Sequence, residues 1–404
     1  MSYSPKVLPL EGVIQTYAWG GDSFLSDLTG KPQPREETWA EWWLGAHPKG
    51  PAETAMGTLD KLISDRPAEV LSKKIAAQYE NKLPFLLKVL DVQDTLSIQV
   101  HPTIAMAKAG YAREEAAGLD RMAANRNYRD QNHKPELAIA LTDFYLLHGF
   151  KSLDRIAETL KNEPAWAPLL TTLSDQGLTA LYDRVMSASE EQIKAWLSAL
   201  RQRLAKAENL SKSEPDYWAK RAFERYGADR GIFSIYWLNL VSLKPGEGIF
   251  QAARVPHAYL SGACVELMAN SDNVLRGGLT PKHVDPPELM KALEFSETTP
   301  KILSGTALDS GWKVFETPAP DFKLFSAKGS RVAALPFPAG PAIMVVYEGR
   351  AIVKNSAVKQ KENKGSVFLE GQDFRRGQAC WLPHNHGAEL HLSNDAIVYL
   401  ATVG

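Results

Sequence analysis

Cysteine is scarce in this sequence: Cys264 and Cys380 are the only two among 404 residues. Two cysteines so far apart make neither a disulfide framework nor a paired thiolate metal motif. An excess of one charge is also lacking, because 46 lysines and arginines nearly balance 47 aspartates and glutamates and leave a net charge of -1. Proteins that bind nucleic acid generally present a basic face, so we expect no nucleic-acid partner.

Long apolar runs are missing as well. No run reaches the length that a transmembrane helix needs, and even the apolar stretch at 144–147 ends at His148 and Gly149. The N-terminal segment Met1–Lys6 lacks the apolar core of a signal peptide. We therefore expect a cytoplasmic protein with no membrane partner, and we expect it to be a monomer.

The composition is ordinary for a globular protein, with 44% hydrophobic and 23% charged residues. The length is too great for one small core and favours two or three domains. Up to about residue 145, strand-like runs alternate with short helical stretches. The apolar runs at 83–90 and 95–100 predict buried strands, and the alanine-rich stretch at 105–120 predicts a helix.

Between about residues 152 and 226 the apolar spacing changes to the period of a helix. The segment Ser187-Ala188-Ser189-Glu190 has the pattern of a capping box at a helix start. One apolar stripe follows it: Ile193, Trp196, Leu197, Leu200 and Leu204. This part of the chain predicts a small helical domain.

The strand pattern returns at Ile232, with an apolar run at 234–243. From about residue 299, short β-runs such as 343–347 and 396–401 are separated by glycine and proline. We therefore expect a mainly β protein with two β-barrel or sandwich domains and an inserted helical domain. The predicted division is 1–150 with 231–298, then 151–230, then 299–404.

Four side chains that bind divalent metals stand in short, strand-like segments. Gln99 and His101 are two residues apart, so on a strand both point to the same face. Glu136 and His257 lie in two further segments of this kind. Two imidazoles, one carboxylate and one amide oxygen make a mixed nitrogen and oxygen shell suited to Zn²⁺ or a similar ion.

Three basic residues lie in or near the same segments: Lys134, Arg276 and Lys282. Such residues are usually surface charge. Within these segments, however, they could hold the dianion of a phosphorylated substrate. Lys134 and Lys282 are candidates for phosphate binding or proton transfer, and Arg276 is a third candidate for the same site.

Four more polar residues are candidates for the same site. Glu266 is expected to face the cavity and to orient a hydroxyl or a basic side chain. Tyr259 either hydrogen-bonds to substrate or packs in the core, and Asp272 is either a substrate contact or a turn residue. His133 supports a metal ligand, takes part in catalysis or has a purely structural role.

These segments resemble the metal-site motifs of type I mannose-6-phosphate isomerases. The motifs that carry the resemblance are Ser97–Pro102, His133–Glu136, Pro256–Gly262, Val265–Lys282, Tyr17–Gly20 and Glu41–Gly45. Because they occur separately and in the right order over residues 15–290, the resemblance is specific. The residues after about 300 resemble this family only in being rich in predicted β-strands.

The resemblance implies a cupin architecture and one Zn²⁺ held by Gln99, His101, Glu136 and His257. It also implies reversible conversion of mannose 6-phosphate, a phosphorylated hexose, to fructose 6-phosphate. In the reaction that we expect, the metal and Arg276 act on the O1 and O2 end of the sugar. The proton carrier stays open among Lys134, Glu266 and His133, with Lys134 favoured.

Two other functions remain alternatives. Two histidines and one carboxylate also form the usual site of iron-dependent oxygenases, although Gln99 and the cations argue against it. A non-catalytic sugar-phosphate-binding cupin is the other. Towards the end of the sequence, His384, His386 and His391 have the spacing of metal ligands on a strand. No motif of the family includes them, and the flanking proline and glycine favour a loop equally, so we expect no second metal there.

Overall fold

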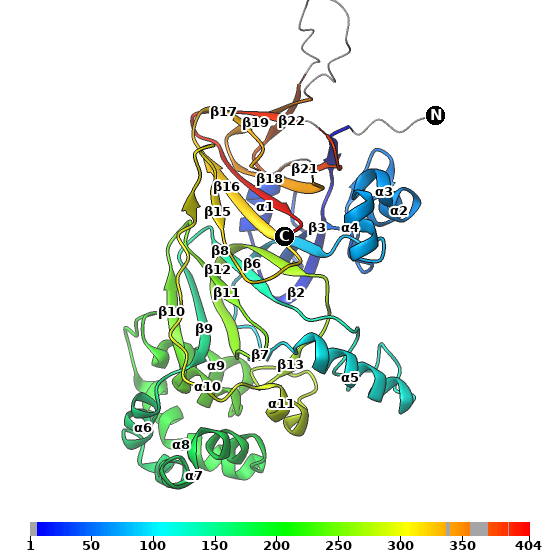
Figure 1. Cartoon of the computed structure of the whole chain (residues 1–404). Helices are drawn as coiled ribbons and strands as arrows, with labels where there is room; N and C mark the ends of the chain where they lie inside the picture. The colour runs from blue at the N-terminus through cyan, green and yellow to red at the C-terminus, as the bar shows by residue number, and fades with distance from the viewer. Residues whose placement is uncertain (1–5, 337–339, 356–370, 387) are drawn as a thin grey trace, which may run out of the picture.

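The structure is a computed structural model that describes residues 6–336, 340–355, 371–386 and 388–404. Two β-rich regions lie one above the other in the view of Figure 1, and a group of helices lies below them. The lower β region contains most of the strands before residue 277, and the upper one most of those after residue 305.

The first β region is a curled antiparallel sheet of ten strands. Its strands are β2 (Val13–Gly21), β3 (Trp39–Gly45), β6 (Phe85–Val92), β7 (Gln99–Val100), β8 (Glu136–Ala140), β9 (Phe144–Phe150), β10 (Leu238–Leu243), β11 (Gly248–Gln251), β12 (His257–Ala269) and β13 (Leu275–Arg276). The long strand β12 pairs with β7 and β9 near its start and with β6 and β8 near its end. Since one strand serves four neighbours, the sheet closes around an interior into which alternate side chains of β12 point.

The helices inserted between β9 and β10 form their own packed group. They are α6 (Leu153–Lys161), the 3₁₀ turn Pro164–Trp166, α7 (Ala167–Met186), α8 (Glu190–Lys206), α9 (Pro215–Tyr226) and α10 (Gly231–Trp237). Their apolar faces share a core with the sheet residues Leu147, Phe150 and Leu260. The helices therefore support the lower end of the first β region.

The second β region combines a seven-stranded and a four-stranded antiparallel sheet. Its strands are β14 (Thr306–Ala307), β15 (Lys313–Phe315), β16 (Lys323–Lys328), β17 (Arg331–Ala334), β18 (Ala342–Glu348), β19 (Arg350–Asn355), β20 (Gln372–Arg375), β21 (Ala379–Leu382), β22 (Ala388–Leu392) and β23 (Ile397–Thr402). The short N-terminal strand β1 (Leu8–Leu10) joins this region, because Leu8 lies opposite Trp381 of β21.

Smaller elements connect these parts: α1 (Phe24–Thr29), β4 (Glu53–Thr54), β5 (Gly57–Thr58), α2 (Leu59–Asp65), α3 (Pro67–Val70), α4 (Lys73–Gln78), α5 (Ile104–Ala116) and α11 (Pro286–Ala292). The helix predicted at 105–120 is α5. Among the described residues, no helix combines the length and the apolar character needed to cross a membrane.

Three predicted elements differ from the structure. The strand expected from Ile232 begins only at Leu238, because Gly231–Trp237 is helix α10. All residues of α10 are buried, so its sequence has no polar face to reveal the helical period. Of the strand expected at 95–100, only Gln99–Val100 pairs. The capping box starts at Ser189, whose partner is Gln192, two residues after the predicted Ser187 and Glu190.

Candidate metal centre

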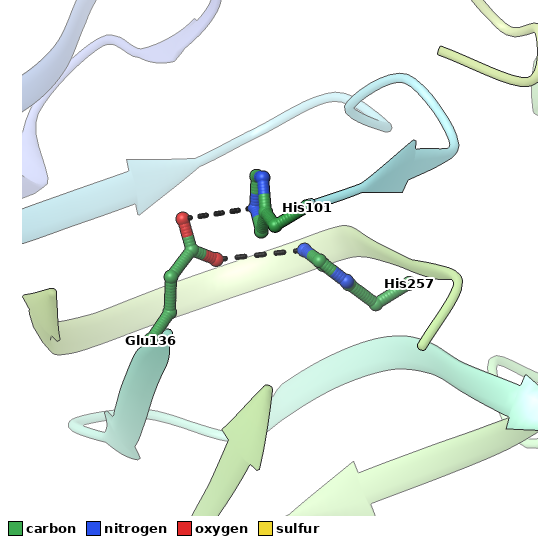
Figure 2. A group of neighbouring side chains, drawn as sticks. All are labelled: His101, Glu136 and His257. Carbon is green, nitrogen blue, oxygen red and sulfur yellow. Dashed lines mark ion pairs between the residues drawn. The ribbon is translucent and has the colours of Figure 1, made fainter. Parts of the chain in front are cut away.

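Glu136, the first residue of β8, directs its carboxylate at two imidazoles (Figure 2). Its Oε1 lies 3.3 Å from Nε2 of His101, and its Oε2 lies 3.4 Å from Nε2 of His257. All three side chains are buried, and one ligand atom from each lies within 4.8 Å of the others. In the described ranges of the chain this is the one group of three or more such residues arranged to hold a metal ion.

Backbone carbonyls fix both imidazoles with Nε2 facing inward. Nδ1 of His101 lies 2.9 Å from the carbonyl oxygen of Asn273, and Nδ1 of His257 lies 3.0 Å from that of Val255. If each Nδ1–H donates to its carbonyl, each Nε2 is left as a free lone pair, which is the usual arrangement of a metal-binding histidine. Nε2 of His101 has no hydrogen bond to any described residue. The donor set therefore fits a divalent ion such as zinc.

The register of the strands places Gln99 beside this group. Gln99 lies opposite His257 on one side and opposite Arg276 on the other, and His257 lies opposite His148. Opposed residues of antiparallel strands point to the same face. The four side chains thus form one row across the interior. This supports Gln99 as a fourth ligand, which stays a prediction.

The electrostatics suit a cation between these groups. Burial alone would raise the pKa of Glu136, but the opposing effects, of which the positive charge of Lys134 is the largest, hold this pKa well below its ordinary value. Burial lowers the pKa of His101 to about 4. The site therefore presents a carboxylate and a neutral imidazole near neutral pH, the protonation states that a metal ligand requires.

Comparison with known proteins places this arrangement in a family. The sequence profile described as phosphomannose isomerase type I, catalytic domain, matches residues 7–153. The mannose-6-phosphate isomerase of Salmonella typhimurium is 37% identical over 376 residues, which span 89% of this chain and 93% of that protein. The human mannose-6-phosphate isomerase is 33% identical, with 80% and 82% of the two chains covered. This chain belongs to the type I mannose-6-phosphate isomerase family.

Solved structures agree with this assignment and with the predicted fold class. The Salmonella typhimurium mannose 6-phosphate isomerase bound to fructose 6-phosphate and zinc has a TM-score of 0.86, at 30% identity, covering 98% of this chain and 99% of that one. A mannose 6-phosphate isomerase bound with zinc and yttrium is equally similar. The prediction of a mainly β, cupin-type enzyme with an inserted helical region is confirmed.

The isomerase interior also holds a buried ion network that sequence reasoning missed. Lys88 of β6 lies 3.3 Å from Glu41 and 3.2 Å from Glu266, and all three are at most 8% exposed. Burial alone would lower the pKa of Lys88, but the two carboxylates outweigh it and raise this pKa. The available signal was a lysine within the otherwise apolar run at 83–90.

Glu266 and Tyr259, both predicted site residues, belong to this network. The hydroxyl of Tyr259 donates a hydrogen bond of 2.9 Å to Oε1 of Glu266. Burial and the nearby Glu136 carboxylate raise the pKa of Glu266, against the opposing effect of Lys88. Glu266 thus points into the same interior as the metal group, and Tyr259 orients it.

Basic side chains gather next to the metal group. Arg276 lies in the row with Gln99, and Lys282 lies over the ring of Tyr17 at 5.9 Å. Besides burial, the positive charge of Arg129 lowers the pKa of Arg276, and Arg276 and Arg129 lower that of Lys282. We call Arg129, Arg276 and Lys282 the cation cluster. None of the three forms an ion pair with a carboxylate among the described residues. The sequence did not predict Arg129 as a member of the site.

Lys134 and Asp272 each pair with a neighbour near the site. Nζ of Lys134 lies 3.2 Å from Oε1 of Glu136, so this lysine shares the interior face. Asp272 lies 2.8 Å from Nζ of Lys49 and 3.7 Å from Nε2 of His47. Lys134 therefore lies at the metal group, and Asp272 lies on the loop that follows β12.

His133 takes a different direction from its neighbour Lys134. Its Nε2 lies 2.8 Å from Oδ2 of Asp321, a buried residue of the second β region. Adjacent residues of an extended segment point to opposite sides, which explains why Lys134 faces the metal group and His133 does not. The geometry therefore favours a structural role for His133 over support of a metal ligand, and its catalytic role stays a prediction.

Proposed function

We propose that this chain interconverts mannose 6-phosphate and fructose 6-phosphate by proton transfer through an enediol, with one zinc ion held by Gln99, His101, Glu136 and His257. The observation that carries the proposal is the buried metal group with the cation cluster beside it. A zinc ion supplies Lewis-acid polarisation of the sugar oxygens without redox chemistry. The related Salmonella structure, which is bound to fructose 6-phosphate and zinc, supports the combination of a zinc ion with a phosphorylated sugar.

The chain's own residues would then divide the reaction between them. Arg276 donates hydrogen bonds to the O1 and O2 end of the open-chain sugar, where the enediolate gains negative charge. Lys134 accepts the proton from C2 and returns it to C1, while O1 gains the hydroxyl proton that O2 loses, so the carbonyl moves from C1 to C2. Glu266, held by Tyr259 and Lys88, is the second candidate for this proton transfer.

The test of this function is fructose 6-phosphate formation from mannose 6-phosphate before and after treatment with a chelator, followed by zinc. We expect the chelator to abolish turnover and added Zn²⁺ to restore it. A folded, zinc-loaded protein without turnover would contradict the proposal. Iron content and oxygen consumption, measured on the same sample, test the oxygenase alternative, which the comparisons do not favour.

Arg129 and Lys282, the two members of the cation cluster that are not assigned to the O1 and O2 end, are proposed to bind the substrate phosphate. Replacing Arg129 or Lys282 by alanine removes one charge-assisted hydrogen bond, worth ~1.5–3 kcal/mol, so we expect KM to rise about 10–100-fold with a much smaller change in kcat. Steady-state kinetics check this. Arg201→Ala, an exposed arginine on α8, is the control and should leave KM unchanged. An unchanged KM in both cluster variants would exclude these residues from phosphate binding.

We also propose the predicted division into residues 1–150 with 231–298, 151–230 and 299–404. All the proposed ligands come from the first unit, which supports it as the catalytic part. The pairing of β1 with β21 refines the boundary, because residues 8–10 belong structurally with the last unit. A monomer in the cytoplasm stays a prediction.

A further inference from the structure

Gln251 is a fully buried glutamine beside the metal group. It ends β11, its exposed fraction is 0%, and neither Oε1 nor Nε2 has a hydrogen-bond partner among the described residues. In the strand register Gln251 lies opposite Glu136, so both side chains point to the same face. Because Glu136 points at the two imidazoles, the amide of Gln251 points into the same interior.

His148 on β9 is a second buried polar side chain in this place. It is 5% exposed and lies opposite His257 in the register, so it shares the face of that proposed ligand. Its Nε2 lies 3.3 Å from the carbonyl oxygen of Phe250, the residue before Gln251. Nδ1 has no partner among the described residues. If Nε2–H donates to this carbonyl, Nδ1 is left as an acceptor that needs a donor.

These unpartnered atoms are unfavourable unless something small and polar binds them. A buried amide without hydrogen bonds destabilises a fold, and a leucine of nearly the same size would not. Ordered water is the ordinary ligand of such groups, provided that two to four polar partners converge on it. The amide of Gln251, Nδ1 of His148 and the carboxylate of Glu136 provide donors and acceptors on one face.

We propose that Gln251 and His148 form a buried water site behind the metal ligands. A water there accepts from the Gln251 amide, donates to Nδ1 of His148 and donates its other proton to the Glu136 carboxylate. It thereby holds this carboxylate in place for the metal ion. Gln251 and His148 are positioning residues in this scheme, and the inference rests on the proposed zinc site.

The test is the zinc affinity of Gln251→Leu, measured by competition with a chromophoric chelator in the absence of substrate. Removing a hydrogen-bond partner of a metal ligand typically costs about 10–100-fold in metal affinity, and we expect a loss in this range. We also expect the visible spectrum of the cobalt-loaded protein to change, because the carboxylate shifts. His148→Asn is the second variant, with the same expected direction, should Gln251→Leu not fold.

The matched control is Gln372→Leu on β20. Gln372 also has an amide oxygen without a partner in the described part of the chain, but its Nε2 donates to the carbonyl of Val7, far from the metal group. Its zinc affinity should equal that of the unchanged protein. Unaltered affinity and cobalt spectrum in Gln251→Leu or in His148→Asn would overturn the water site alone. Failure of the unchanged protein to bind zinc would overturn both this inference and the proposed function.

Discussion

Alanine in place of Glu136 is expected to remove zinc binding and, with it, nearly all isomerase turnover. Glu136 is the single carboxylate of the metal group, and its two oxygens face His101 and His257 separately. A catalytic metal contributes several kcal/mol, and about 4 kcal/mol corresponds to ~10³-fold in rate. We therefore expect kcat to fall by at least about 10³-fold, with less than one zinc per chain by mass spectrometry.

Loss of stability is the main alternative cause of such a result. Glu163→Ala is a suitable control, because Glu163 is also buried and pairs with a cation, Arg203, but lies in the helical insertion. This variant should be destabilised and keep both zinc and turnover. If Glu136→Ala bound zinc with unchanged affinity, the proposed ligand set would be wrong.

Methionine in place of Lys134 is expected to leave zinc bound and to lower kcat about 10²–10⁴-fold, the usual contribution of a general acid–base residue. The length of the side chain is nearly preserved, while the amine beside Glu136 is lost. Exchange of the C2 hydrogen with deuterated water, followed by NMR, reports the proton transfer directly. This exchange should slow in parallel with turnover.

The same measurement distinguishes Lys134 from Glu266. Glu266→Gln removes the acid–base group but keeps the shape and the hydrogen bond from Tyr259. If Lys134→Met exchanges the C2 hydrogen at the normal rate and Glu266→Gln does not, the proton carrier is Glu266. If both exchange normally, neither residue carries the proton.

The candidate metal ligands could be predicted because their signal is local. Gln99 and His101 alternate along one segment, and strand geometry alone predicts that they share a face. The same rule, applied to His133 and Lys134, would have separated these neighbours before the structure did. The shared motif of His133 and Lys134 does not by itself separate the two side chains.

The Lys88 network could not be predicted in full from the sequence. Its partners come from three strands, since β3 supplies Glu41, β6 Lys88 and β12 Glu266. Which strands become neighbours depends on sheet closure, and no short segment encodes this. A lysine in an apolar run indicates only that some buried carboxylate must accompany it. Helix α10 was missed for the opposite reason, because uniform burial erases periodicity.

Strand β1 has a consequence for how the protein is made. Leu8 and Leu10 belong to one apolar core with Trp42 of the first β region and Trp381 of the second. During synthesis on the ribosome, β21 at residues 379–382 is made long after its partner β1 at residues 8–10. Pairing at such sequence separation is slow, and an unpaired strand edge favours aggregation in the meantime. We therefore expect nascent chains of this isomerase to need a chaperone until β21 has been synthesised.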